Sequence, residues 1–519
     1  MPTIPEALRF ALQHHQAGRL QQAEDICLQI LQACPDHPDV LHLLGVLAYQ
    51  VGRHDLAVDY IRQAIRHGPN VAEFYNSMGE ICRAQGKLEE AVPCYRQALA
   101  LKPAYAEAYN NLAIALSGQD KPAEAEAAYR QALALRPDFA EAHYNLGNVL
   151  QAQGKVEEAV ASYRQAVTLK PTIAEAHNNL GGLLRTLGRF EEAVAHLRQA
   201  VGIRPDYAEA ENQLLLLSQQ ICEWTELNEL FARQRRLIRE KPSANMPPFT
   251  LLSIPASAGE QLVCARNRAV HLFASCASLR EKLGFHFVRS PEPKLRIGYL
   301  SADFREHAVA HLMAELFELH DRNAFEVSAY SYGPDDGSEM RKRIVGVCDR
   351  YADIASLSFV DAARRIHNDG IDILVDLQGY TRLARTQILA LRPAPIQVNY
   401  LGYPGTMGAD FIDYIVTDRF ITPPEQESFF SEKCVYLPDC YQANDRKRRI
   451  AEKTPARAEC GLPESGFVFC CFNSAFKITP AVFDVWMRVL KEIPGSVLWL
   501  LETDRVATAN LRREAHDRG

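Results

Sequence analysis

The apolar residues of this chain follow two patterns. From Leu295 onward, short apolar runs alternate with longer segments of helical character. The runs predict strands at 295–300, 325–331, 371–377, 395–400, 413–417 and 433–437, and the segments predict helices near 309–319, 338–347, 359–368, 382–391 and 423–429. Alternation of this kind predicts a doubly wound parallel sheet with helices on both faces. Before residue 207 the pattern is a repeat instead.

Three columns of the first half keep a period of 34 residues. The prolines are Pro35, Pro69, Pro103, Pro137, Pro171 and Pro205; the alanines are Ala23, Ala57, Ala91, Ala125, Ala159 and Ala193; the glycines are Gly18, Gly52, Gly86, Gly154 and Gly188, with Asp120 in the remaining slot. A helix–turn–helix period of this length is typical of tetratricopeptide repeats. We predict about six repeats over 3–206, with glycine ending each first helix and proline stopping each second one.

A further column carries asparagine at Asn111, Asn145 and Asn179, after Leu43 and Ser77 in the earlier repeats. A ladder of side-chain amides on the concave face could pair with the backbone of an extended peptide, because each amide has a donor and an acceptor. The alternative is that these asparagines only cover a solvated helix face.

The rest of the chain divides into four segments. Residues 207–290 lose the period and are predicted to form helices that cap the repeats and connect onward. Residues 291–441 hold the parallel sheet, and 442–463 is a linker rich in Lys, Arg, Glu and Ala. Residues 464–519 start a second α/β unit, with strands at FVFCCF and 496–501.

Candidate chemistry falls on loops at the carboxyl ends of strands, where open α/β sheets bind ligands. His307 follows the first strand, QGYT (378–381) follows a later one, and LGYPGTMG (401–408) follows the next. On this stretch alone, His307 could instead be a loop histidine that caps or packs the next helix, and His367, near a helix end, could be a C-terminal cap.

Lys477 follows the first strand of the second unit, just before Thr479-Pro480 opens a helix. A lysine beside free helix-terminal N–H groups suits phosphate oxygens, although a solvated lysine would look the same.

Composition narrows the class further. The net charge is −7 with no long basic run, so charge gives no case for nucleic acid. The 13 cysteines show no metal-site spacing, which favours reduced thiols and a cytoplasmic location. We expect no signal peptide, no membrane span, no cofactor and no metal site.

Several longer motifs together resemble the bacterial protein O-GlcNAc transferases, which join tetratricopeptide repeats to a SPINDLY-type catalytic region. These motifs are LRIGYLSADFREHAVAHLM (295–313), PDDGSEMR (334–341), RRIHNDGIDILVDLQGYTRLAR (364–385), LRPAPIQVNYLGYPGTMGADFIDYIVTD (391–418) and GSVLWLLE (495–502). The resemblance spans nearly the whole chain, and the LGYPGT block is its most specific part.

The resemblance implies a two-lobed B-type glycosyltransferase of Rossmann-like lobes. Such an enzyme transfers GlcNAc from UDP-GlcNAc to Ser or Thr hydroxyls of proteins, with inversion and without an obligatory metal. It also implies functional roles for His307 and His367, diphosphate binding by Lys477, donor contacts from Gly402, Tyr403, Pro404, Gly405 and Thr406, and peptide binding by the asparagines. Whether His307 is the base or a substrate positioner stays open.

Two departures from the family pattern matter. Ser474 stands where the family usually has glutamine, and the family's His-Thr-Thr segment would lie beyond Gly519. We therefore expect an incomplete second lobe and weak or no transfer by residues 1–519 alone. The rival hypotheses are a non-catalytic peptide-binding scaffold and a related protein O-fucosyltransferase.

Overall fold

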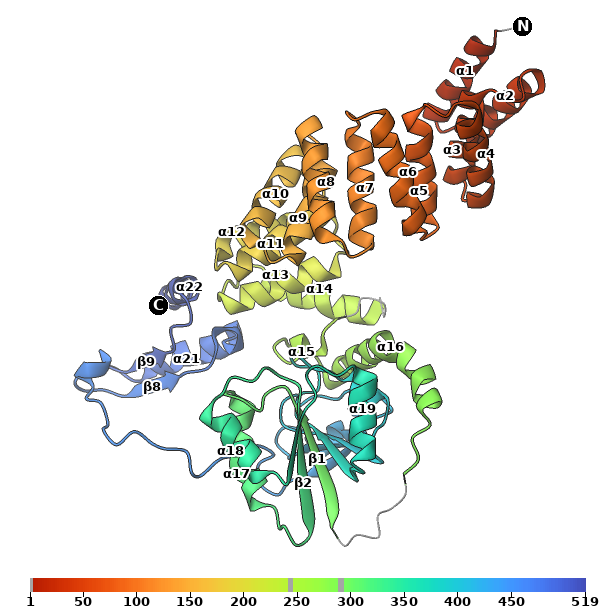
Figure 1. The fold of residues 1–519 in the computed structure, drawn as a ribbon. Coiled ribbons are helices and arrows are strands. Elements are labelled where there is room, and N and C mark those ends of the chain that lie inside the picture. The colour runs from red at the N-terminus through yellow and green to blue at the C-terminus, as the bar shows by residue number, and fades with distance from the viewer. Residues whose placement is uncertain (1–2, 241–245, 288–293) are drawn as a thin grey trace. The chain divides into compact units, whose positions relative to one another are not determined.

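The computed structural model describes residues 3–240, 246–287 and 294–519, which form two compact units (Figure 1). The first unit is Met1–Tyr207 and the second is Ala208–Gly519. Each unit is described separately below.

Consecutive helices of the first unit pack as pairs, six pairs in its described residues (Figure 1). The helices are α1 (Ile4–Gln16), α2 (Leu20–Ala33), α3 (Pro38–Gln50), α4 (His54–His67), α5 (Ala72–Ala84), α6 (Leu88–Leu101), α7 (Ala106–Gly118), α8 (Pro122–Leu135), α9 (Ala140–Ala152), α10 (Val156–Leu169), α11 (Ala174–Thr186) and α12 (Phe190–Ile203). This confirms the tetratricopeptide prediction.

The three periodic columns each have a structural reason. All six alanines of the column are 0% exposed, because only a methyl group fits where the two helices of a pair touch. The five glycines have φ between +72° and +78°, the left-handed conformation that ends the first helix of each pair. Asp120 fills the sixth slot with φ +58°, a conformation that costs a residue with a Cβ more than it costs glycine.

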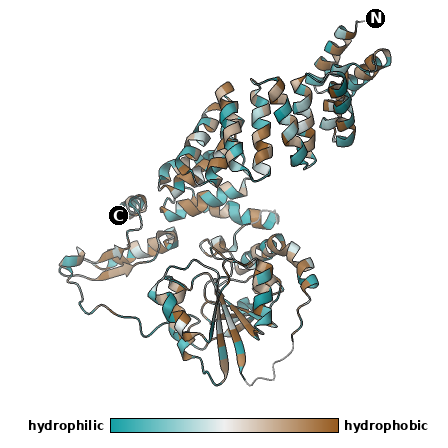
Figure 2. Ribbon diagram, in the orientation of Figure 1, coloured by the Kyte–Doolittle hydropathy of each residue, from teal (hydrophilic) through white to brown (hydrophobic). Residues whose placement is uncertain are grey.

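The sheet of the second unit has seven parallel strands in the order β3-β2-β1-β4-β5-β6-β7. Its strands are β1 (Leu295–Ser301), β2 (Phe325–Ser331), β3 (Arg350–Asp353), β4 (Ile373–Asp376), β5 (Ile396–Asn399), β6 (Tyr414–Thr417) and β7 (Lys433–Tyr436). Most residues of β1, β2, β4 and β5 are buried, as expected for strands between two helical layers, and Figure 2 shows hydrophobic colour along much of the front strands of the sheet. The order is that of a doubly wound Rossmann-like fold, which confirms the predicted fold class.

The helices of this lobe are α17 (Ala308–Leu319), α18 (Glu339–Val347), α19 (Phe359–Asn368) and α20 (Gln387–Ala390), with a 3-10 helix η1 (Pro424–Phe429). Three predictions need correction. The short strand β3 was not predicted, since only four residues pair with β2. The predicted helix 382–391 shrinks to α20, because Leu383 takes a left-handed φ of +68°. The predicted helix 423–429 is a 3-10 helix.

The connecting segment and the second α/β part pack together. The connector holds α13 (Ala208–Gln220), α14 (Leu227–Glu240), α15 (Pro248–Leu251) and α16 (Ala258–Leu283). The second part holds η2 (Ala458–Cys460), β8 (Val468–Cys471), η3 (Ala475–Lys477), α21 (Pro480–Glu492), β9 (Val497–Leu500) and α22 (Arg505–Asp517), with β8 and β9 paired in parallel. Asn510 Nδ2 donates to the Ile221 carbonyl at 2.8 Å, and the rings of Trp224 and Phe483 meet edge-on at 5.3 Å.

Ion pairs connect the start of the predicted linker to the part of the chain that holds the seven-stranded sheet, residues 294–441. Arg446 donates to both carboxylate oxygens of Glu315, and Asp445 pairs with Arg343 at 2.5 Å. In the described parts of the chain, no helix is long and apolar enough to cross a membrane.

Replacing Asp120 with glycine should stabilise the first unit by about 0.5–1 kcal/mol, because glycine adopts the left-handed conformation without a Cβ penalty. The measurement is chemical unfolding followed by circular dichroism. The reciprocal variant Gly86→Asp should lose a similar amount. Equal stability of Asp120→Gly and the parent chain would contradict this account of the column.

Candidate functional site

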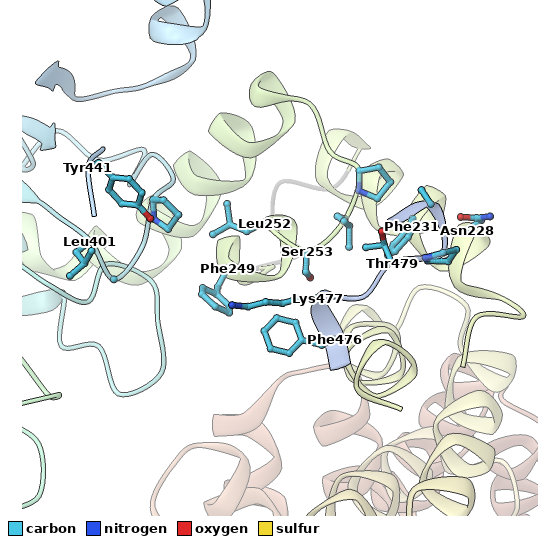
Figure 3. Close-up of a pocket in the computed structure, with 16 residues that line it drawn as sticks. Asn228, Phe231, Phe249, Leu252, Ser253, Leu401, Tyr441, Phe476, Lys477 and Thr479 are labelled. Carbon is cyan, nitrogen blue, oxygen red and sulfur yellow. The ribbon is translucent and has the colours of Figure 1, made fainter. Parts of the chain in front are cut away.

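A cavity of about 670 Å³ lies where three segments of the second unit meet (Figure 3). The connector supplies one wall, the LGYP turn after β5 supplies another, and η3 with the start of α21 supplies the third. The lining residues are Asn228, Phe231, Phe249, Leu252, Ser253, Ile254, Pro255, Leu401, Gly402, Pro404, Tyr441, Phe476, Lys477, Thr479, Pro480 and Ala481. Residues from both α/β parts therefore face one space.

Lys477 is the lysine among these lining residues. Figure 3 shows its side chain extending toward Phe249, with Phe476 nearby. Its Nζ is 3.4 Å from Asn473 Oδ1, a long contact that leaves the ammonium group available to a ligand. Thr479 caps α21 by accepting the Val482 N–H at 3.4 Å, so the helix begins beside the lysine.

The third wall thus combines a positive charge with the positive end of a helix dipole. This combination suits phosphate oxygens. Ser474 precedes η3 and accepts the Lys477 N–H through its carbonyl at 3.0 Å, but its side chain is not among those that line the cavity.

The LGYP turn reaches the cavity through a close backbone contact. A Cβ on Gly402 would lie 2.0 Å from the Leu377 carbonyl oxygen, so only glycine permits this approach. Asn399 Nδ2 donates to the carbonyls of Tyr403 and Gly405, which fixes the turn after β5. Gly402 and Pro404 line the cavity as a result.

The other three predicted residues of this turn stay out of the cavity lining. Tyr403 is 1% exposed, and a Cβ on Gly405 would meet its hydroxyl at 2.7 Å. Thr406 Oγ1 donates to Glu432 at 2.8 Å, and the Met407 N–H donates to the same carboxylate at 2.5 Å. Burial raises the pKa of Glu432. These residues hold the shape of the turn.

A hydrogen-bonded cluster occupies the neighbouring strand ends, after β1 and β4. Gln378 Nε2 donates to Asp303 Oδ2 at 2.5 Å and to Ser301 Oγ at 3.1 Å, and Thr381 Oγ1 donates to Gln378 Oε1 at 2.6 Å. Asp376 accepts the N–H groups of Gln378 and Gly379, and burial raises its pKa to about 6.

His307 belongs to this cluster. It is the N-cap of α17, where its Nδ1 accepts the Val309 N–H at 3.3 Å and lies 3.4 Å from Asp303 Oδ2. His307 is not one of the residues that line the 670 Å³ cavity. His307 is joined to the cavity wall indirectly, through Asp303 and Gln378. Gln378 donates to Asp303, and the Cα of Gln378 would lie 3.4 Å from a Cβ placed on Gly402, which lines the cavity.

His367 lies at the amino ends of the strands, on the side of the sheet opposite to His307. It is near the end of α19, and a Cβ on the following Gly370 would touch Arg296 at the start of β1. His307 follows the far end of that strand, which spans about 20 Å. The His367 ring stacks on Phe285 with centroids 4.3 Å apart. In this structure the His367 ring therefore packs against the connector.

The asparagine column in the first unit is not uniform. Asn111 Nδ2 donates to Glu80 at 2.9 Å and to Asn76 at 3.2 Å, and burial raises the pKa of Glu80. Asn179 Nδ2 donates to Asn148 at 3.0 Å. These bonds tie neighbouring repeats together.

Asn145 differs from the other two asparagines. The position 31 residues before Asn111 and Asn179 is polar, but the one before Asn145 is Ile114. Asn145 and Ile114 instead line a cavity of about 380 Å³ with Ser117, Asp120, Pro122, Tyr129, Asn148, Val149 and Ala152. An amide beside apolar side chains can take a polypeptide backbone and a side chain together.

Sequence reasoning missed the contribution of the connector, where no chemistry was expected. Asn228, Phe231, Phe249 and the run Leu252–Pro255 line the larger cavity. The break at Pro247-Pro248, which starts the short helix α15, was visible in the sequence, but nothing local indicates which cavity such a turn will face.

No group of three or more metal-ligating side chains occurs in the parts of the chain that the structure describes. All 13 cysteines are free.

Comparison with known proteins agrees with this architecture. A family model for glycosyl transferase family 41 matches residues 221–454 and 448–519, and tetratricopeptide models match 3–69, 79–120, 110–172 and 147–208. The first match covers more than half of the chain. The chain therefore belongs to glycosyl transferase family 41 and carries tetratricopeptide repeats, which confirms the family resemblance found in the sequence.

Two curated relatives show the extent of the similarity. The chain is 35% identical over 325 residues to the probable UDP-N-acetylglucosamine–peptide N-acetylglucosaminyltransferase SEC of Arabidopsis thaliana, covering 59% of this chain and 33% of that protein. It is 27% identical over 425 residues to the Caenorhabditis elegans UDP-N-acetylglucosamine–peptide N-acetylglucosaminyltransferase, covering 58% and 37%. The matches thus span about a third of the length of these relatives.

Among solved structures, a lysine-to-methionine mutant of the Thermobaculum terrenum O-GlcNAc transferase is similar in fold. The TM-score is 0.50 at 27% identity, covering 80% of this chain and 72% of that one.

Gly402→Ala should destabilise the second unit by about 1–3 kcal/mol, because the added methyl group collides with the Leu377 carbonyl. Chemical unfolding monitored by tryptophan fluorescence measures this change. Gly346→Ala in α18 is the matched control, since its Cβ meets nothing within 4 Å and alanine favours the helix. Equal effects of the two substitutions would contradict the close approach described here.

Proposed function

We propose that this chain is a protein O-GlcNAc transferase of the inverting, metal-independent type. It would bind UDP-GlcNAc in the 670 Å³ cavity and move GlcNAc to Ser or Thr hydroxyls of a bound polypeptide. The observation that carries the proposal is the common cavity lined by Lys477, the start of α21 and the LGYP turn. The names of the similar proteins and the family membership support the same donor and acceptor.

The chemistry of the site fits this reaction. The acceptor hydroxyl oxygen forms a bond to C1 of GlcNAc on the face opposite the diphosphate, while the bond from C1 to the β-phosphate oxygen breaks. UDP leaves with that electron pair, so negative charge builds on the leaving oxygen. A lysine ammonium and helix-terminal N–H groups at fixed positions stabilise this charge without needing to reorganise during the reaction.

The hydroxyl proton must go to a base. A neutral histidine is the side chain best suited near pH 7, and His307 stands at the carboxyl edge of the same sheet as the LGYP turn. Because His307 is outside the cavity lining, we assign it to the acceptor side of the reaction and Lys477 to the donor side. His367 lies at the amino ends of the strands, and in this proposal its ring stabilises the packing of the connector.

The repeats would hold the acceptor polypeptide. In this proposal Asn145 binds peptide backbone, while Asn111 and Asn179 keep neighbouring repeats in register. We place the protein in the cytoplasm, in keeping with its 13 free cysteines, and expect no nucleic acid or membrane partner.

Two other functions make different demands on the same residues. A peptide-binding scaffold would need the repeats but not Lys477. A protein O-fucosyltransferase would use the same layout with a GDP-linked donor, so the choice of nucleotide separates it from the proposed enzyme.

Titration of the chain with UDP by calorimetry tests the proposal. We expect Lys477→Ala to weaken UDP binding by about 10- to 100-fold, because a charged hydrogen bond contributes about 1.5–3 kcal/mol. Lys342→Ala is the matched control, since that lysine is exposed on α18 and pairs with Glu339. Heat release with GDP and none with UDP would favour the fucosyl alternative. Peptide binding with no nucleotide binding would favour the scaffold.

Substitution in the asparagine column tests the acceptor role of the repeats. Asn145→Ala should weaken binding of a Ser/Thr-rich acceptor peptide several-fold with little loss of stability, because Asn145 lines a cavity. Asn111→Ala should instead lower stability by about 1 kcal/mol, because it removes bonds between repeats. Fluorescence anisotropy of the labelled peptide and thermal unfolding provide the two readouts. A result in which both variants behave alike would contradict the division of roles.

A further inference from the structure

We propose that Asp303 is the positioning residue of His307 and selects the form of the imidazole that can accept a proton. The inference rests on the proposed function for its catalytic meaning, but the geometry on which it stands is independent of the donor. The two side chains are four residues apart, in the loop between β1 and α17, with His307 Nδ1 3.4 Å from Asp303 Oδ2.

Asp303 is a buried carboxylate that accepts hydrogen bonds from neighbouring side chains. Its residue is 7% exposed, and its Oδ2 accepts Gln378 Nε2 at 2.5 Å. Arg305 donates to Oδ1 at 3.4 Å, and Ser301 Oγ accepts the Asp303 backbone N–H at 2.9 Å. An ionised carboxylate removed from water requires several donors, because unmatched buried charge is costly. His307 is a further donor available to Oδ2.

Two groups compete for His307 Nδ1. The Val309 N–H donates a hydrogen bond to Nδ1 at 3.3 Å, which needs a lone pair there, whereas Asp303 Oδ2 lies at ion-pair distance, 3.4 Å from Nδ1, and would need a proton there. A neutral imidazole can satisfy only one of them, since each ring nitrogen either carries the proton or accepts one.

A hydrogen bond from Nδ1 to the Asp303 carboxylate would be the stronger of the two. A hydrogen bond to an ionised group is about twice as strong as one between neutral groups. The Val309 N–H belongs to the first turn of α17, where N–H groups have no intrahelical partner and water can satisfy them. The charge of Asp303 therefore favours a proton on Nδ1, with the bond from Val309 given up and the lone pair on Nε2.

This choice matters for proton transfer. The His307 side chain is 38% exposed, so its ring is open to a bound acceptor while Asp303 stays buried. With the lone pair on Nε2, the ring can take the hydroxyl proton, and Asp303 stabilises the imidazolium that results. With the proton on Nε2 instead, that nitrogen could only donate a hydrogen bond and could not take the hydroxyl proton.

Gln378 and Thr381 extend the positioning to the next strand end. Gln378 Oε1 accepts the Thr381 hydroxyl, which leaves Nε2 facing Asp303 and so fixes the amide orientation. Gly402, which lines the cavity, packs against the backbone of Leu377 and Gln378. This packing therefore also helps to hold Gln378, and through it Asp303, in place.

The test is nuclear magnetic resonance of the full chain labelled with ¹⁵N-histidine at pH 8.5, where imidazoles are neutral. The His307 signals are identified by their loss in His307→Gln. We expect the wild-type ring to carry its proton on Nδ1, and Asp303→Asn to move it to Nε2, because the Asn amide can donate to Nδ1. Asp335→Asn, at an exposed carboxylate paired with Arg341, should leave the tautomer unchanged.

A wild-type His307 protonated on Nε2 would overturn the proposal, whatever the variants do. An Asp303→Asn chain that keeps Nδ1 protonated would overturn it equally. This readout needs no turnover, so it separates the proposal from the proposed function. Where transfer is measured, Asp303→Asn should lower kcat at least tenfold with the KM for UDP-GlcNAc unchanged, because Asp303 does not line the donor cavity. A change in KM alone would contradict the positioning role.

Discussion

The backbone of Gly402 against the carbonyl of Leu377 is the contact on which the site depends. A parallel sheet brings the carboxyl ends of β1, β4 and β5 to one edge, but it does not by itself bring their loops into contact. Gly402 closes that gap, because no side chain stands between the two backbones. One side of the contact faces the cavity that contains Lys477, and the other side supports Gln378 and hence Asp303 and His307. The groups that we assign to the donor side and to the acceptor side are linked through it.

Most of the architecture could be predicted from periodicity. The 34-residue columns predict the helix pairs, because each repeat needs a small residue where its two helices touch and a left-handed residue where its first helix ends. The alanines and glycines meet these two requirements. The apolar runs predict six of the seven strands of the main sheet for the same kind of reason, since a strand buried on both faces must be apolar. The strand β3 escaped prediction because its four residues, RYAD, carry little apolar signal.

The site was less predictable than the fold, because its members meet through tertiary contacts. Lys477, Gly402 and Pro404 were found from strand-end position and from family motifs, and they line one cavity. The family motif alone does not place His367, but the order of elements does: it is in the last turn of the helix that precedes β4, so it lies at the amino end of that strand. The asparagine column was read as uniform, yet Ile114 makes Asn145 differ from its two counterparts.

In the proposed function, Lys477 and the LGYP turn form one side of a site for a nucleoside diphosphate. Reductive methylation of lysines, followed by mass spectrometry with and without UDP, tests this assignment. We expect UDP to slow methylation of Lys477 several-fold, while the exposed Lys342 reacts at an unchanged rate. Binding of UDP with no protection of Lys477 would contradict it.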